Sequence, residues 1–198
     1  VNYRESFGMF ACNGILFNHE SPLRGETFVT RKITQALSRI VCGIQDRLIL
    51  GNLDAKRDWG HAKEYTELMW LILQHSEPRD FVAATNKQYS IREFVELCSK
   101  ELGIEIEWRG SGVDEIGVVK EYNHILKDVD PFLKKGDVLI SISDEYFRPS
   151  EVNTLLGDAS LAKDLLGWEP KIGIKELASE MISSDLADAI TRYRLQNL

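Results

Sequence analysis

Short apolar runs alternate with longer amphipathic stretches along most of this chain. The runs with the length and composition of buried strands are residues 9–17, 48–50, 80–84 and 138–142. The stretches with apolar positions three and four residues apart, which predict helices, are 28–43, 61–75, 90–102 and 173–193. Strands that alternate with helices of this length are typical of an α/β protein.

Capping and turn residues refine several of these boundaries. Gly8 is placed to close a helix that occupies the first residues of the chain. Ser90 and Glu93 have the spacing of a capping box, in which each side chain bonds a free amide of the first turn. The helix at 61–75 is apolar on more than one side, which predicts that it is well buried. Residues 109–136 are rich in glycine and mixed charge, and we expect a long loop or insertion there.

Length and charge exclude several classes of function. The 198 residues suffice for one domain, or for one large domain with a small appendage, and 43% hydrophobic residues support a packed core. The net charge of −7 argues against a nucleic-acid-binding or membrane-surface protein, because both need a basic face. The longest apolar run, 68–73, is too short to cross a bilayer.

The cysteines indicate a reducing compartment, and we expect a cytoplasmic protein. Cys12, Cys42 and Cys98 are far apart and each lies in an apolar pattern, which is typical of buried free thiols. The sequence contains no Cys-x-x-Cys or His-Glu-x-x-His spacing, so we expect no metal site. The chain begins with Val1 inside a predicted helix and carries no visible signal peptide, so we expect a piece of a longer protein.

The stretch 48–62 contains the strongest candidate for an anion site. Its apolar strand is broken by Gly51 and Asn52, and Lys56 and Arg57 follow in a predicted loop. An arginine fork can bind phosphate oxygens through two parallel hydrogen bonds. Spacing alone nevertheless favours a solvated turn whose charges face water.

Other polar residues leave more than one interpretation open. The loop 18–25 follows a predicted strand, and ligands of α/β sheets bind at the carboxyl ends of strands. Arg148 and Glu151 flank Pro149; the carboxylate has the chemistry to accept bonds from sugar hydroxyls, or simply to pair with the arginine. The glycine-rich segment 110–117 is not a phosphate loop, because its third glycine is misplaced, no apolar helix follows and two acidic residues would repel a pyrophosphate.

Several blocks of the sequence, in order, resemble GDP-mannose 4,6-dehydratases, a family of extended short-chain dehydrogenase/reductases. The blocks are residues 13–22, 28–33, 50–62, 146–152, 156–158 and 166–170. The Arg-Asp-Trp at 57–59 is of a kind found in many nucleotide-sugar enzymes. The Asn-His-Glu-Ser-Pro at 18–22 and the Phe-Val-Thr-Arg-Lys-Ile at 28–33 narrow the resemblance to this family.

The resemblance implies an NADP-dependent conversion of GDP-mannose to GDP-4-keto-6-deoxymannose, toward GDP-fucose and related sugars. Such enzymes oxidise C4, eliminate water across C5 and C6, and return the hydride to C6. It also implies a homo-oligomer, either a dimer or a tetramer.

The resemblance assigns roles to individual residues by matching position. The cofactor contacts are His19 and Arg24. The contacts to the GDP-sugar are Asn18, Val29, Lys32, Gly51, Lys56, Arg57, Arg148 and Glu151. Val29 and Lys32 are assigned to the guanine pocket, Arg57 and Arg148 to the diphosphate, and Glu151 to the ribose. Asn18 is expected near the diphosphate, and Gly51 and Lys56 near the ribose.

This chain departs from the family pattern in two ways. The family usually has two arginines after Ser-Pro, in a loop that reaches a neighbouring subunit, whereas here the first is Leu23. The glycine-rich cofactor loop and the Tyr-x-x-x-Lys pair precede Val1 in the family, and no Tyr-x-x-x-Lys spacing occurs in these 198 residues. We therefore expect no catalytic residue in this chain.

The expected fold is α/β: the C-terminal part of a Rossmann-type doubly wound sheet with a smaller mixed α/β substrate-binding domain. Residues 1–27 and 47–90 are expected to supply mainly Rossmann-side elements, and 28–46 and 91–198 mainly the substrate-binding region. Two alternatives remain open. One is another nucleotide-sugar epimerase or dehydratase; the other is a non-catalytic binding or oligomerisation module.

The absence of the catalytic pair leads to a first prediction. The isolated chain should not convert GDP-mannose when NADP is added, because the residues that move protons in the family are missing. An assay that follows consumption of GDP-mannose tests this, and turnover by the chain alone would contradict it.

Overall fold

The computed structural model describes the chain except for residues 127–128, 130–131, 147–151 and 197–198. The described residues divide into two compact units. The first unit comprises Val1–Ser21, Lys56–Tyr89 and Thr154–Leu177, and the second comprises Pro22–Ala55, Ser90–Asn153 and Ala178–Leu198. Each unit is therefore assembled from three separate stretches of the sequence.

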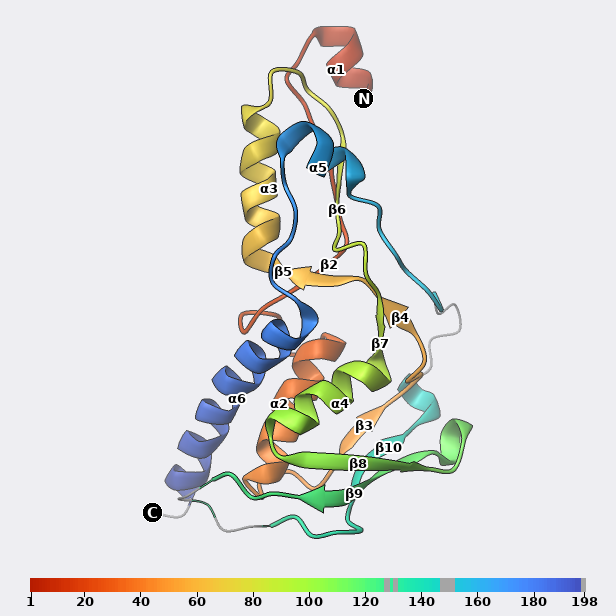
Figure 1. Cartoon of the computed structure of the whole chain (residues 1–198), viewed down its shortest axis with the longest axis vertical. Coiled ribbons are helices and arrows are strands. Elements are labelled where there is room, and N and C mark those ends of the chain that lie inside the picture. Colours follow the sequence, from red (N-terminus) through yellow and green to blue (C-terminus); the bar gives the residue numbers. More distant parts are fainter. Residues whose placement is uncertain (127–128, 130–131, 147–151, 197–198) are drawn as a thin grey trace. The chain divides into compact units, whose positions relative to one another are not determined.

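Parallel strand pairs organise the first unit (Figure 1). Its elements are α1 (Asn2–Phe7), β1 (Gly14–Leu16), β2 (Asn18–Glu20), β4 (Lys56–Arg57), β5 (Trp59–His61), α3 (Ala62–Gln74), β6 (Phe81–Ala83), β7 (Tyr89–Ser90) and α5 (Ser160–Leu166). β1 pairs with β6 and β2 with β5, both in parallel, and β4 lies beside β7. Helix α3 connects β5 to β6 along the chain, and these two strands belong to different parallel pairs.

The core of the first unit lies between α3, β6 and α5. Its fully or nearly buried members are Tyr65, Leu68, Ile72, Phe81, Ala83, Ala84, Ala159, Ala162 and Trp168. The rings of Tyr65 and Trp168 meet edge to face with centroids 6.0 Å apart, and the Trp168 indole donates to the Glu64 carbonyl at 3.1 Å. The aromatic pair thus joins α3 to the segment after α5.

A mixed sheet, two helices and most of the C-terminal helix form the second unit (Figure 1). Its strands are β3 (Leu48–Leu50), β8 (Ile104–Arg109), β9 (Ile116–Tyr122) and β10 (Val138–Ile142), in the order β3-β10-β9-β8. Only the β3–β10 pair of this sheet is parallel. Helix α2 (Val29–Val41) packs against β3 and against α4 (Ile91–Glu101), which in turn contacts β8.

A buried ion pair connects α2 to the C-terminal helix α6 (Ile174–Gln196) within the second unit. The Arg31 Nη2 lies 2.9 Å from the Asp185 Oδ1, and the Thr34 hydroxyl donates to the Oδ2 of the same carboxylate at 2.6 Å. Burial raises the pKa of Asp185, and the hydrogen bond from Thr34 and the charge of Arg31 oppose that shift. The pair fixes the register between the two helices.

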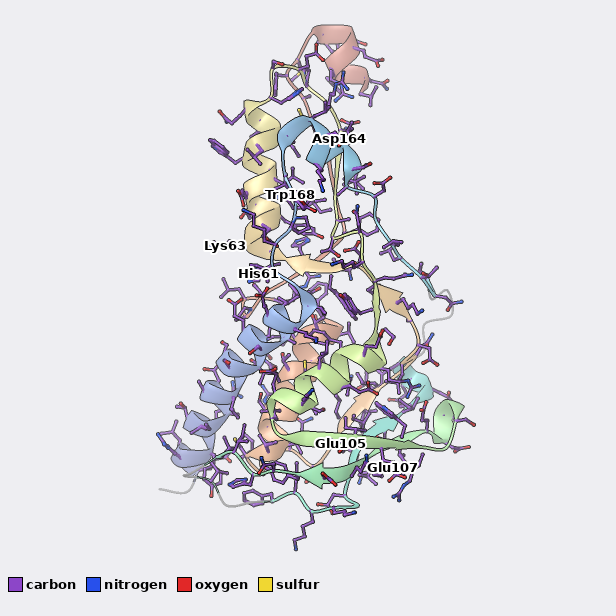
Figure 2. All side chains as sticks on the ribbon, viewed as in Figure 1. His61, Lys63, Glu105, Glu107, Asp164 and Trp168 are labelled. Carbon is purple, nitrogen blue, oxygen red and sulfur yellow. The ribbon has the colours of Figure 1, made fainter. Side chains whose placement is uncertain are left out.

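Most of the helix and strand predictions are confirmed, including the capping box of Ser90 and Glu93 and the helix end at Gly8. Ser90 and Glu93 form the capping box at the start of α4. His61 caps α3, because its Nδ1 accepts a hydrogen bond from the Lys63 amide at 3.1 Å (Figure 2). Gly8 closes α1 in the left-handed conformation, at a φ of 63°.

Four local predictions are wrong. Residues 9–13 are not a strand, whereas Asn18–Glu20, predicted as loop, is β2 and pairs with β5. Lys56 and Arg57, also predicted as loop, form β4 beside β7. The predicted loop 109–136 contains β9, a central strand of the sheet, because β8 and β10 supply hydrogen bonds on both sides.

A further error concerns α3, which is not well buried. Its sheet-facing side is covered, but Trp70 and Leu73 on the other side are each 61% exposed. One helix face suffices to close the core of the first unit, so the remaining apolar positions of α3 contribute little to that core.

Asp58 stabilises the first unit through hydrogen bonds to two distant segments. Its Oδ1 accepts from the Thr85 amide at 2.8 Å and from the Thr85 hydroxyl at 2.7 Å, and its Oδ2 accepts from the Gly157 amide at 3.3 Å. The side chain is fully buried. Removing it would leave the Thr85 and Gly157 amides without this acceptor at a buried position.

We therefore expect Asp58→Ala to lower the free energy of unfolding by about 2–3 kcal/mol. Urea denaturation followed by circular dichroism measures this change. The matched control is Asp164→Ala, at an exposed aspartate on α5 (Figure 2), which should change stability by less than about 0.5 kcal/mol. Equal effects of the two substitutions would contradict the assigned role of Asp58.

Candidate functional site

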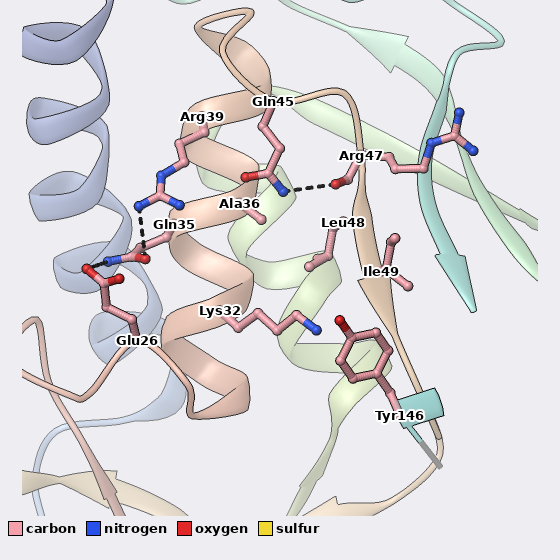
Figure 3. Close-up of a pocket in the computed structure, with 10 residues that line it drawn as sticks. All are labelled: Glu26, Lys32, Gln35, Ala36, Arg39, Gln45, Arg47, Leu48, Ile49 and Tyr146. Carbon is pink, nitrogen blue, oxygen red and sulfur yellow. Dashed lines mark hydrogen bonds between the residues drawn. The ribbon is translucent and has the colours of Figure 1, made fainter. Parts of the chain in front are cut away.

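A polar cavity of about 300 Å³ opens beside α2 and β3 in the second unit (Figure 3). It is lined by Glu26, Lys32, Gln35, Ala36, Arg39, Gln45, Arg47, Leu48, Ile49 and Tyr146. Four of these residues recur on one face of α2 at positions 32, 35, 36 and 39, which is the spacing of a helix face. The volume falls at the lower end of the range for small-molecule sites, roughly 300–1,000 Å³.

Lys32 and Tyr146 face each other across this cavity (Figure 3). The Lys32 Nζ lies 3.5 Å from the centroid of the Tyr146 ring, a distance at which the ring face attracts the ammonium group. Tyr146 ends the short 3₁₀ helix η2 (Asp144–Tyr146). Burial lowers the pKa of Lys32 below the ordinary lysine value of 10.5.

Gly51 determines how closely η2 approaches the end of β3. A Cβ atom at Gly51 would overlap with the Tyr146 carbonyl oxygen and lie 2.7 Å from the carbonyl carbon. The turn before Tyr146 is tied to β3, because the Ser143 amide donates to the Leu50 carbonyl at 2.9 Å. The absence of a side chain at Gly51 therefore lets the Tyr146 ring lie beside the cavity.

A chain of side-chain hydrogen bonds lines the opposite part of the cavity (Figure 3). Arg39 donates to the Gln35 Oε1 at 3.3 Å, and Gln35 donates to the Glu26 carboxylate at 3.2 Å. The lining thus includes the Glu26 carboxylate, linked through Gln35 to Arg39, and the Lys32 ammonium group, whereas the Arg47 guanidinium points away from these side chains (Figure 3). An ammonium group and a carboxylate suit a ligand that carries both hydrogen-bond acceptors and donors.

The structure brings together some of the residues predicted as a site. Lys32 and Gly51 both contact Tyr146. Val29 begins α2 one turn before Lys32 but does not line the cavity. Arg24 stacks on the Phe28 ring, with its guanidinium carbon 3.6 Å from the ring centroid. Arg148 and Glu151 lie outside the described residues.

The other predicted site residues lie in the first unit. Asn18 and His19 are neighbours on β2, and Lys56 and Arg57 are neighbours on β4. The Arg57 Nη1 donates to the Lys56 carbonyl at 2.9 Å. The His19 Nδ1 donates to the Phe17 carbonyl at 2.9 Å, and the His19 ring packs 5.3 Å from the Tyr65 ring. A neutral His19 therefore keeps its Nε2 as an acceptor.

These contacts fit a dinucleotide cofactor only in part. His19 offers one acceptor, and Arg24 offers a cation stacked on an aromatic ring. The sequence contains no glycine-rich fingerprint that would hold a pyrophosphate on backbone amides. The described residues therefore do not form a complete cradle for such a cofactor.

The described residues lack both a membrane-spanning helix and a metal-binding cluster. No helix in that part of the chain is long and apolar enough to cross a membrane. No group of three or more His, Cys, Asp or Glu side chains in the same residues is arranged to hold a metal ion.

Sequence reasoning missed part of the cavity. Glu26, Gln35, Arg39, Arg47 and Tyr146 were not predicted as site residues. The spacing of Gln35 and Arg39 relative to Lys32 was the available signal, because residues three, four and seven positions apart share a helix face. Nothing in the sequence indicated that η2 would bring Tyr146 to that face.

The fold belongs to a class shared by nucleotide-sugar epimerases and dehydratases. RMD from Pseudomonas aeruginosa, solved with NADPH, aligns with a TM-score of 0.70 at 19% identity, over 94% of this chain and 51% of that one. A UDP-N-acetylglucosamine 4-epimerase from Methanobrevibacter ruminantium aligns with a TM-score of 0.65 at 19% identity, over 94% and 49%. The α/β fold of Rossmann type predicted from the sequence is thereby confirmed.

The chain belongs to the GDP-mannose 4,6 dehydratase family, whose sequence model matches residues 1–181. It is 57% identical to GDP-mannose 4,6-dehydratase of Vibrio cholerae serotype O1 over 96% of its own length, and 47% identical to the human protein of that name over 94%. It spans about half the length of these relatives: 50% of the first and 46% of the second. The resemblance found in the sequence is confirmed.

The burial of Lys32 leads to a prediction about its titration. We expect the ε-methylene NMR signal of Lys32, assigned with Lys32→Arg, to titrate below pH 10.5, because burial disfavours the charged form. The unfolded chain keeps this proton to higher pH, so the group should make stability rise with pH between the folded pKa and 10.5. Titration of Lys32 at or above 10.5 would contradict the burial seen here.

Proposed function

We propose that this chain is the sugar-nucleotide-binding portion of a GDP-mannose 4,6-dehydratase and that the cavity at Lys32 and Tyr146 holds the guanine base. The observation that carries the proposal is the arrangement of an ammonium group, an aromatic face and a carboxylate around one cavity. The chain's membership of the family supports it.

Guanine matches the chemistry of this cavity. Its O6 and N7 are acceptors that a lysine ammonium group can bond, and its N2 amino group is a donor that a carboxylate can accept. Lys32 supplies the ammonium group and Glu26 supplies the carboxylate. The Tyr146 side chain is partly exposed and offers an aromatic surface for stacking the base. A volume of about 300 Å³ suits a base and ribose better than a whole nucleotide sugar.

The remaining contacts of GDP-mannose follow from the family resemblance. Arg57, with Lys56 beside it on β4, is proposed to bind the diphosphate, because guanidinium groups pair with phosphate oxygens through two hydrogen bonds. Asn18 is proposed near the same group, and Gly51 near the ribose. The resemblance implies three further contacts that belong to this proposal: Val29 in the guanine pocket, Arg148 at the diphosphate and Glu151 at the ribose.

We infer a nicotinamide cofactor, specifically NADP, as the hydride carrier of the whole enzyme. NADP supplies a site that accepts the hydride from C4 of the sugar and returns it at C6. This chain's part is to contact the cofactor through His19 and Arg24 and to hold the nucleotide sugar in place. A homo-oligomer, a dimer or tetramer in the cytoplasm, belongs to the same proposal, as does the assignment of 1–27 and 47–90 to the Rossmann side.

Nucleotide titration tests the proposal. Isothermal titration calorimetry of the chain should show saturable binding of GDP that is at least about tenfold tighter than that of UDP or dTDP, since neither carries the guanine amino group. Lys32→Met should weaken GDP binding by about tenfold, the scale expected for a lost charged hydrogen bond. Arg57→Ala should weaken the binding of all three nucleotides.

Lys100→Met is the matched control, because Lys100 is an exposed lysine on α4 outside this cavity. It should leave the affinity for GDP unchanged. Tighter binding of UDP or dTDP than of GDP would point to another nucleotide-sugar enzyme. Binding of no nucleotide would contradict the assignment of a substrate pocket to this chain.

A further inference from the structure

The segment between β3 and β4, residues 51–55, connects the cavity to the proposed diphosphate residues along the chain. It begins at Gly51, against Tyr146, and is followed directly by Lys56 and Arg57. Two amides of the first turn of α4 hold its backbone: Ile91 donates to the Ala55 carbonyl at 3.2 Å, and Arg92 to the Leu53 carbonyl at 2.9 Å. Such amides have no partner inside the helix, so this segment satisfies them.

The Arg92 side chain adds a second restraint on the same segment. Its Nη2 and Nε donate to the Asp54 Oδ1, at 3.0 and 3.3 Å. Its other contacts hold the guanidinium group in place: Nη1 and Nη2 donate to the two oxygens of Glu115 at 2.7 and 3.1 Å. The guanidinium carbon also lies 4.7 Å from the centroid of the Trp108 ring.

The two carboxylates have different surroundings. The Glu115 side chain is only 15% exposed, whereas that of Asp54 is 78% exposed. A bidentate, mostly buried pair is strong and geometrically specific, while an exposed pair is worth little by itself. Glu115 therefore fixes the orientation of Arg92, and Arg92, once fixed, presents its remaining N–H groups to Asp54.

Glu115 comes from the glycine-rich segment that the sequence excludes as a phosphate loop. Gly110 and Gly112 have φ angles of 82° and 60°, which L side chains rarely adopt, and they let the chain turn between β8 and β9. A Cβ at Gly110 would lie 3.1 Å from the carbonyl carbon of Asp114. The tight turn places Glu115 beside Arg92.

We infer that Arg92 is a positioning residue for the nucleotide site: it holds residues 51–55 in the geometry in which Gly51 lies against Tyr146 at the cavity. The inference rests on the proposed function. It assigns a role to the segment 110–115, which supplies the carboxylate that orients Arg92. Arg92 itself does not line the cavity.

Two readouts on the 198-residue chain test this role. The first is hydrogen exchange at the amides of Asp54 and Ile91, which report on the segment and its contact with α4. The second is the dissociation constant for GDP. We expect Arg92→Met to speed exchange at both amides and to weaken GDP binding, each by about tenfold. Arg92→Lys keeps the charge but loses the fork, so we expect it to recover the affinity only in part.

The matched control is Arg109→Met. Arg109 also pairs with a glutamate, Glu107, at 2.7 Å, but both side chains are about half exposed and lie on β8. This variant should change neither readout. Urea denaturation of both variants gives their stabilities, so a loss of affinity can be separated from a loss of folded protein.

The outcomes separate this inference from the proposed function. Faster exchange with weaker GDP binding in Arg92→Met, and neither in Arg109→Met, supports the positioning role. Unchanged exchange overturns it, as does faster exchange with an unchanged dissociation constant, because Arg92 would then be only structural. A wild-type chain that binds no GDP overturns the proposed function and, with it, a role of Arg92 in binding; the exchange data still decide whether Arg92 restrains residues 51–55.

Discussion

The connection from β3 to α3 is held by charged hydrogen bonds in each of the two units, and the role proposed for Arg92 rests on the hydrogen bonds of the second unit. In the second unit Arg92 bonds Asp54, and the first turn of α4 bonds the backbone of residues 53–55. In the first unit the buried Asp58 accepts hydrogen bonds from Thr85 and Gly157. Between these anchors lie Lys56 and Arg57. Without these hydrogen bonds, conformational entropy would favour many other backbone conformations of this connection.

The cavity also depends on a small number of contacts. Three elements that are distant in sequence build it: the polar face of α2, the end of β3, and η2. Gly51 permits the close approach of η2, and that approach places Tyr146 under the Lys32 ammonium group. Because each contact depends on another, a larger residue at Gly51 is expected to displace Tyr146. That displacement would change the surroundings of the Lys32 ammonium group.

Local patterns in the sequence were sufficient to predict most of the helices. The apolar spacing of α2, the capping box of α4 and the His61 cap of α3 are all interactions between residues close in sequence. Such features depend little on the rest of the fold. The family resemblance added what these patterns lacked, because it assigned Lys32 to a guanine pocket and Gly51 to the neighbourhood of the ribose.

The wrong or missing predictions share a physical cause: each of these features depends on residues that are distant in the sequence. β9 contains glycine, lysine and glutamate, and becomes a strand because β8 and β10 flank it. β2 and β4 are short and polar, and exist only through pairing with β5 and β7. The exposure of Trp70 depends on how many faces of α3 the first unit covers. Tyr146 reaches Lys32 across more than a hundred residues of sequence.

The most direct test of the account is to locate bound guanine nucleotide in a crystal structure of the chain with GDP. The account predicts that the guanine ring lies in the cavity, stacked on Tyr146, with its O6 or N7 within hydrogen-bond distance of the Lys32 ammonium group and its amino group near Glu26. A guanine ring bound elsewhere, with this cavity left to solvent, would contradict it.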